Sequence, residues 1–231
     1  ITPLNFSGTL QIYSEIDGTV TNGNVDRYQD FDQHHLQITG MSSRDNEMYM
    51  TGETKNSHIH FVVGSNLRLL KAKKQPPIEV NNQENRLQQI LSTDVSVGKT
   101  YNFEKNVTIY TDRETAADSL NETASQDIAS ASYDQTAKQS EDYWKQAWNN
   151  FDIKIDTDIT SQKLTRVNLF HSMVSAAAIG SGKLDASVGA RGLHGEAYRG
   201  HVFWDEMFVL PFYTLHYPEL TKQLLMYRYR R

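Results

Sequence analysis

Hydrophobic and polar residues alternate through the first half of the chain with the period of two that is typical of β-strands. The stretch GTLQIYSEIDGTV shows the pattern clearly, with Leu10, Ile12 and Tyr13 among polar neighbours. Five further segments follow at short spacing: HHLQITG, NEMYMTGET, SHIHFVVGS, NRLQQILSTDVSVG and YNFEKNVTIYTD. Gly, Asn, Asp and Ser separate these segments, as is usual for turns. The pattern predicts part of an N-terminal antiparallel β-sandwich domain over residues 1–111.

The composition changes near Thr111. Residues 113–151 are rich in Ala, Gln, Glu, Asp and Ser, contain neither Pro nor Gly, and carry few apolar side chains before Tyr143. Trp144 and Trp148 are one helical turn apart and therefore share a face. We predict a helical linker over residues 112–159 that docks by its aromatic C-terminal end. The segment FDIKID, residues 151–156, is expected to form a short strand.

Helical spacing dominates residues 160–231. The first predicted helix, residues 160–180, carries apolar side chains at Leu164, Val167, Phe170, Met173, Val174 and Ala177. Thr160 or Ser161 is expected to cap it, and Gly180 to end it. A glycine-rich loop precedes two more predicted helices, residues 203–217 and 218–231, with Pro218 in the first turn of the second. Three helices cannot close a helical domain, so this part is expected to be incomplete.

Composition and charge exclude several classes of function. The formal net charge is −5, which argues against nucleic-acid binding, because that needs a basic face. The chain has no Cys, which excludes disulfides, Cys-ligated zinc and thiol nucleophiles. It shows neither a secretory signal nor an apolar run long enough to span a membrane. Tyr and Phe are plentiful, which suits ring-shaped ligands. The cellular location is left open.

The densest candidate chemistry lies in HGEAYRGHVFWDEMFVLPF, residues 194–212. Trp204 and Asp205 place an aromatic plane beside a carboxylate, an arrangement that holds a sugar by stacking and by accepting hydroxyl hydrogen bonds. Arg199 and His201 are expected to add donors. The alternative for Phe203 and Trp204 is a place in a helix–helix core.

The acidic residues of this stretch do not form an obvious catalytic pair. Asp205 and Glu206 are adjacent, so on a helix they point about 100° apart and cannot flank one bond as acid and base. Whether Glu196 and Asp205 converge is left open. His58 and His60 share a strand face, but no Asp or Glu spacing completes a familiar ligand set, and no metal site is predicted.

The C-terminal stretch GLHGEAYRGHVFWDEMFVLPFYTLHYPELTKQLLMYRYRR resembles glycoside hydrolase family 65, which includes maltose, kojibiose and trehalose phosphorylases and related α-glucoside hydrolases. RVNLFHSMVSAA resembles the family's first barrel helix, and LQIYSEIDGTVTN resembles a strand pair of its N-terminal super-sandwich. The resemblance implies part of that sandwich, residues 1–111, a helical linker, residues 112–159, and the start of an incomplete (α/α)6 barrel, residues 160–231. The rest of the barrel, in the same polypeptide or as a clipped fragment, is the implied partner. A homodimer is left open.

The resemblance also implies a function, the inverting cleavage of an α-glucosidic bond in a disaccharide or short oligosaccharide of the kojibiose, maltose or trehalose type. Trp204 and Asp205 are implied to contact the non-reducing glucose, with Arg199, His201 and Phe203 in the same matched motif. No residue here matches the family's general acid, so the isolated chain is expected to be inactive.

The resemblance leaves open whether water or phosphate attacks the glucosyl carbon. The family's phosphorylases usually read Trp-Asp-Thr-Glu, whereas Glu206 and Met207 follow Asp205 here. This departure favours hydrolysis over phosphorolysis, with a disaccharide phosphorylase as the alternative. No organic cofactor is implied, and inorganic phosphate is a co-substrate only if the enzyme is a phosphorylase. The alternative from another class is a non-catalytic carbohydrate-binding module.

Overall fold

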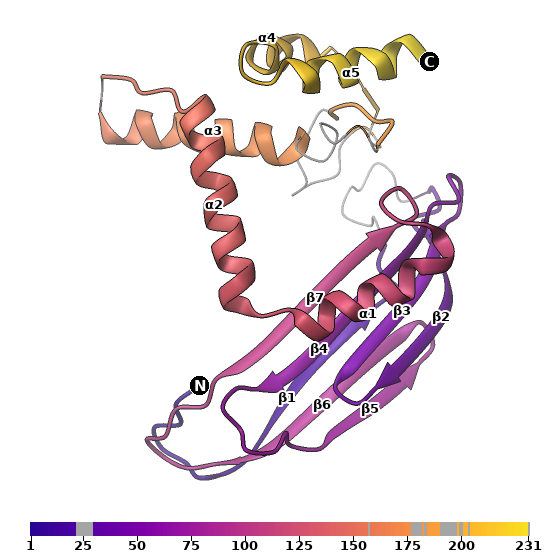
Figure 1. Cartoon of the computed structure of the whole chain (residues 1–231), viewed down its shortest axis with the longest axis vertical. Helices are drawn as coiled ribbons and strands as arrows, with labels where there is room; N and C mark the ends of the chain where they lie inside the picture. The colour runs from indigo at the N-terminus through magenta and orange to yellow at the C-terminus, as the bar shows by residue number, and fades with distance from the viewer. Residues whose placement is uncertain are drawn as a thin grey trace. The chain divides into compact units, whose positions relative to one another are not determined.

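The computed structural model describes residues 1–21, 30–156, 158–176, 182, 184–189, 198, 201–202 and 204–230. The chain divides into two compact units (Figure 1). Residues 1–21 and 31–138 form the first, and residues 139–231 form most of the second. The boundary falls inside helix α2, Tyr133–Phe151. The predicted division at residues 111 and 159 stays a prediction.

The first unit contains two antiparallel sheets, as predicted. One has the order β1-β6-β5 and the other the order β2-β3-β4-β7 (Figure 1). The strands are β1 (Gly8–Asp17), β2 (Leu36–Arg44), β3 (Glu47–Thr54), β4 (His60–Leu69), β5 (Ile78–Gln83), β6 (Arg86–Val95) and β7 (Phe103–Thr111).

Alternate residues of the strands form the core between the two sheets. Met48 and Met50 of β3 are buried there with Ile16 of β1 and Leu87 of β6. These positions follow the period of two that the sequence shows, because successive side chains of a strand point to opposite faces. Burial of each such side chain contributes about 1.5–3 kcal/mol.

Helix α1, Leu120–Ser130, covers the outer face of the four-stranded sheet and follows the short 3₁₀ helix η2, Ala117–Ser119. Leu120, Ala124 and Ile128 are its buried residues, and their spacing of four puts them on one face. Gly64 of β4 allows this close approach. A Cβ atom there would lie 2.9 Å from Thr108 and 3.3 Å from Ile128.

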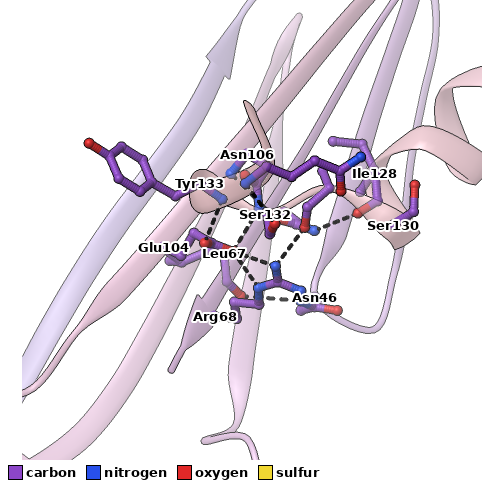
Figure 2. Close-up of polar contacts among 12 residues, drawn as sticks. Asn46, Leu67, Arg68, Glu104, Asn106, Ile128, Ser130, Ser132 and Tyr133 are labelled. Carbon is purple, nitrogen blue, oxygen red and sulfur yellow. Dashed lines mark hydrogen bonds and ion pairs between the residues drawn. The ribbon is translucent and has the colours of Figure 1, made fainter. Parts of the chain in front are cut away.

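Side chains of the sheet also donate hydrogen bonds to the backbone carbonyls at the C-terminal end of α1. Asn66 Nδ2 donates to the carbonyl of Ile128 over 3.1 Å, and Arg68 Nη2 donates to the carbonyl of Ala131 over 2.6 Å. The last carbonyls of a helix have no partner within the helix, so such donors fix where it ends. Figure 2 shows Arg68 and Ile128 within this group of polar contacts.

Glu104 of β7 fixes the start of α2 in the same group of contacts. Its carboxylate accepts the backbone N–H of Tyr133 over 2.9 Å, Asn106 Nδ2 over 3.0 Å and Arg68 Nε over 2.6 Å. Burial on its own would raise the pKa of Glu104, but these hydrogen bonds and the charge of Arg68 hold that pKa below its ordinary value of 4.5. The charged form is therefore the one that ties α2 to the sheet (Figure 2).

The second unit is helical. The C-terminal half of α2 packs with α3 (Ile159–Ala176), α4 (Glu206–His216) and α5 (Pro218–Arg230). Pro218 begins α5, as predicted. The core contains Ala147, Phe151, Met173, Ala176, Val188, Tyr213, Leu220 and Leu224. Trp144 and Trp148 pack against this core, and the ring of Trp144 lies 4.9 Å from that of Phe170. The predicted docking of the linker's aromatic end is confirmed.

Two local predictions for this unit are wrong. FDIKID forms no strand, because α2 continues to Phe151, which is fully buried in the helical core, and residues 152–156 have no regular structure. The cap of α3 is Asp158 rather than Thr160 or Ser161. Its Oδ1 accepts the backbone N–H groups of both of those residues, over 2.9 and 3.0 Å. Gly180, the predicted end of this helix, lies outside the described residues.

The Glu104 contacts predict a specific acid sensitivity. A carboxyl whose folded pKa is depressed stabilises the fold above its unfolded pKa, and this contribution is lost as pH falls through the folded value. The melting temperature of the full-length protein should therefore fall more steeply below about pH 4.5 than that of Glu104→Gln. Thermal unfolding across pH is the measurement. The exposed Glu122→Gln of α1 is the control, and it should follow wild type. Parallel profiles for wild type and Glu104→Gln would contradict the assignment.

A second prediction concerns Gln89, which is fully buried between the sheets beside Ser14, its cross-strand partner. Neither amide atom of Gln89 has a hydrogen-bond partner within the described part of the chain. A buried group without a partner costs about 1–3 kcal/mol, so Gln89→Met should raise the free energy of unfolding by a similar amount. Gln88→Met, on the opposite face of β6, should not. Denaturant unfolding measures both. A loss of stability in Gln89→Met would mean that buried water solvates the amide.

Candidate functional site

Trp204 and Asp205 form the turn that leads into α4. The carbonyl of Trp204 accepts the N–H of Met207 over 3.0 Å, and that of Asp205 accepts the N–H of Phe208 over 3.1 Å. These bonds make the turn continuous with the first turn of the helix. The Trp204 side chain is 68% exposed, and its ring lies 5.2 Å from that of Phe208. Trp204 thus lies outside the hydrophobic core of the second unit.

The Asp205 carboxylate does not cap its own helix. Asp205 occupies the N-cap position, but its backbone is already helical (φ −55°, ψ −32°) and its side chain makes no capping hydrogen bond. A capping aspartate normally has an extended backbone and accepts an N–H group from the first turn. The Asp205 carboxylate is therefore not engaged by the first turn of its own helix.

The other predicted site residues are only partly described. His201 is exposed and contacts Tyr198 twice. Its Nδ1 lies 2.7 Å from the Tyr198 carbonyl, and its backbone N–H donates to the same carbonyl over 3.0 Å. Arg199 and Phe203 lie outside the described residues, as does Glu196.

Glu206 is the residue whose role sequence reasoning missed. It begins α4, yet it is only 6% exposed. Arg228 of α5 donates to Oε2 through Nε over 2.9 Å and approaches the same oxygen with Nη2 at 2.8 Å. Ser187 Oγ donates to Oε1. The only signals in the sequence were an acidic residue in the first turn of one helix and a basic residue in the last turn of the next.

Two further contacts hold the helices around this turn. Arg230 of α5 pairs with Asp185 at 2.8 Å. The buried Tyr213 of α4 donates its hydroxyl to the carbonyl of Ser172 of α3 over 2.7 Å, and burial raises the pKa of Tyr213 to about 12. The start of α4 is thus connected to α5 and to residues 184–189, and its middle to α3.

One face of α4 is apolar and open. Met207, Leu210, Pro211, Thr214 and Leu215 line a shallow depression on it. Met207 is 71% and Leu215 81% exposed. Apolar surface of this kind is typical of a face that contacts further protein.

Among the described residues, no group of three or more His, Asp or Glu could hold a metal ion. His58 precedes β4 and has a left-handed backbone (φ 50°), so the prediction that it shares a strand face with His60 is wrong; its Nδ1 lies 3.5 Å from Glu53 Oε2. No helix in the described ranges has the length and apolar character needed to cross a membrane.

Two family models match the chain. The model described as glycosyl hydrolase family 65, N-terminal domain, matches residues 1–147. The model described as glycosyl hydrolase family 65 central catalytic domain matches residues 166–231.

Similar proteins include several phosphorylases. A trehalose 6-phosphate phosphorylase of Lactococcus lactis subsp. lactis (strain IL1403) is 34% identical over 228 residues, which are 98% of this chain and 29% of that protein. A kojibiose phosphorylase of Thermoanaerobacter brockii is 31% identical over 243 residues, covering 99% of this chain and 30% of that protein. The chain thus spans less than a third of the length of these relatives.

A solved structure assigned as a kojibiose phosphorylase from human microbiome has the same fold. It matches 97% of this chain and 29% of its own chain, with a TM-score of 0.76 and 19% sequence identity. This likeness concerns the fold alone.

Asp205 and Asp158 offer a direct test of the site geometry. Both stand at the start of a helix, but only Asp158 caps with its side chain. In the full-length protein, Asp158→Ala should lower the free energy of unfolding by about 0.5–2 kcal/mol. Asp205→Ala should change it by less than about 0.5 kcal/mol, as surface substitutions usually do. Denaturant unfolding of the two variants is the measurement. Equal losses would show that Asp205 caps α4 in solution.

Proposed function

The chain belongs to glycosyl hydrolase family 65, and on that premise we propose that the full-length enzyme cleaves the α-glucosidic bond of a disaccharide by phosphorolysis. The relatives support phosphorolysis better than the hydrolysis that the sequence reading favoured. The trehalose 6-phosphate and kojibiose phosphorylases resemble the chain over 98–99% of its length. The match of residues 166–231 to a catalytic domain argues against a non-catalytic carbohydrate-binding module.

The sequence departure at Glu206 does not oppose this proposal. Its carboxylate is buried and holds Arg228 and Ser187, so it serves the packing of the helices. The identity of the residue after Asp205 therefore carries little information about whether water or phosphate attacks the glucosyl carbon.

The proposed chemistry is an inverting displacement. A phosphate oxygen attacks the anomeric carbon from the face opposite the leaving group, the glycosidic C–O bond breaks, and a carboxylic acid protonates the leaving oxygen. Inversion of an α-glucoside gives β-glucose 1-phosphate and the released acceptor sugar. The family's general acid has no counterpart in residues 1–231, so we assign no catalytic residue here. The reaction requires inorganic phosphate as co-substrate and no organic cofactor.

We assign Trp204 and Asp205 to the wall of the glucose subsite. The observations that carry this assignment are the exposed ring of Trp204 and, at the next residue, the Asp205 carboxylate, which its own helix does not use. The ring suits stacking on the C–H face of a sugar, and the carboxylate suits acceptance of hydroxyl hydrogen bonds. His201, Arg199 and Phe203 belong to the same motif and are proposed to complete this wall. The linkage of the substrate is left unassigned.

The reaction class can be tested with the full-length enzyme on kojibiose, maltose, trehalose and trehalose 6-phosphate, each with and without inorganic phosphate. We expect turnover of at least one of them to require phosphate and to release glucose 1-phosphate. Release of free glucose at the same rate without phosphate would identify a hydrolase instead.

Asp205→Asn tests the sugar-binding assignment. The substitution keeps the shape but removes the charge from an acceptor of hydroxyl hydrogen bonds. A hydrogen bond to a charged group contributes about 1.5–3 kcal/mol, so kcat/KM should fall about ten- to two-hundredfold. Steady-state kinetics on the best disaccharide measure this. Asp158→Asn, which keeps a good cap on α3, is the matched control and should retain activity. A normally folded Asp205→Asn enzyme with unchanged kcat/KM would refute the assignment.

A further inference from the structure

Glu206 occupies an environment that a carboxylate tolerates only with donors on both oxygens. Its side chain is 8% exposed, and an uncompensated buried charge is strongly destabilising. Arg228 supplies Nε and Nη2 to Oε2, and Ser187 supplies its hydroxyl to Oε1. The position and rotation of the carboxylate are therefore fixed from two sides.

These contacts join three segments of the second unit. Glu206 is the first residue of α4, Arg228 lies in the last turn of α5, and Ser187 precedes Val188, which is buried in the helical core. Nineteen positions of sequence separate Ser187 from Glu206, and twenty-two separate Glu206 from Arg228. The contact is thus tertiary, and it holds the first residue of α4 against α5 and Ser187.

The Trp204–Asp205 turn depends on this anchor. Its two carbonyls bond to N–H groups of the first turn of α4, so the turn moves with the base of the helix. The Trp204 ring is exposed, and the Asp205 side chain makes no capping bond. Among these three consecutive residues, Glu206 is the one whose side chain is buried and ion-paired.

We propose that Glu206 and Arg228 are positioning residues for the glucose subsite, and that their ion pair sets the orientation of Trp204 and Asp205 toward the sugar. This inference rests on the proposed function of the Trp204–Asp205 turn. Neither residue touches the sugar. Misplacement of a binding group by about 1 Å costs up to about a hundredfold in rate, so loss of the pair should weaken glucose recognition without removing a binding group.

The molecule supplies a matched control for this inference. The Asp185–Arg230 pair joins residues 184–189 to the end of α5, as Ser187 and Arg228 do through Glu206, with a similar separation of 2.8 Å. The contact between Asp185 and Arg230 involves no residue of α4. Arg230→Met therefore removes an arginine two residues away on the same helix and leaves the Glu206 anchor in place.

The test compares Arg228→Met with Arg230→Met in the full-length enzyme. For Arg228→Met we expect KM for the disaccharide and the inhibition constant of D-glucose to rise, and kcat/KM to fall about ten- to a hundredfold. KM for inorganic phosphate should stay near wild type, because the proposal assigns the Trp204–Asp205 turn to the glucose and not to the phosphate. Arg230→Met should keep every constant within about twofold, since exposed ion pairs contribute little.

Two further variants separate positioning from folding. Arg228→Met leaves Glu206 buried and unpaired, so Glu206→Gln/Arg228→Met removes both charges. This double variant should melt close to Arg230→Met yet keep the raised inhibition constant of glucose. Glu206→Gln alone keeps an oxygen that accepts from Arg228, while its amide N–H can donate to Ser187 Oγ, so this variant should retain most of the wild-type affinity.

The outcomes distinguish failure of the inference from failure of the proposed function. If Arg228→Met and the double variant bind glucose like wild type, or lose only kcat in proportion to their folded fraction, the pair is merely structural and the inference fails. If Asp205→Asn itself leaves kcat/KM unchanged, the glucose-subsite assignment fails first. A lowered kcat/KM in Asp205→Asn beside an unaffected Arg228→Met overturns the inference alone.

Discussion

A carboxylate is stable inside a protein only where donors occupy its oxygens, and each of the two units satisfies this constraint at one glutamate. In the first unit, Glu104 accepts hydrogen bonds from Arg68, Asn106 and the first N–H of α2. In the second, Glu206 accepts them from Arg228 and Ser187. Glu104 of β7 accepts the N–H of the first residue of α2, and Glu206 is itself the first residue of α4, so each glutamate holds the start of a helix. Hydrophobic burial holds the sheets and helices together without such directional control.

Local patterns in the sequence predict six of the seven described strands, missing β5, and they predict the helix ends poorly. The period of two is a property of each strand alone, and it correctly indicated two packed antiparallel sheets. FDIKID also has strand-like residues. Its first residue, Phe151, is instead buried in the helical core, so α2 continues to that residue. Asp158, Thr160 and Ser161 are all good capping residues, so residue type did not decide among them. Tertiary packing decided the first of these, the extension of α2 through Phe151.

The candidate site divides in the same way. Trp204 and Asp205 can be proposed from the sequence because they are adjacent and their chemistry is evident from residue type. The Glu206–Arg228 pair was not, because periodicity carries no information about contacts between side chains on two different helices. That gap explains the sequence-based preference for hydrolysis. The residue type at position 206 suggested hydrolysis, whereas in the structure the Glu206 carboxylate contributes to the packing of α4 against α5.

The proposed function also accounts for an unusual feature of α4. A capping aspartate would stabilise the helix by about 1 kcal/mol, yet Asp205 stands at the N-cap position and makes no capping bond. A carboxylate engaged by backbone N–H groups would be a weaker acceptor for sugar hydroxyls, so binding and capping compete for the same oxygens. Glu206 removes the conflict, because its pairing with Arg228 and Ser187 anchors the same end of the helix by another route. Functional sites commonly break a local stability rule and compensate nearby. Here the compensation is one residue away, and it leaves the Asp205 carboxylate available to a ligand.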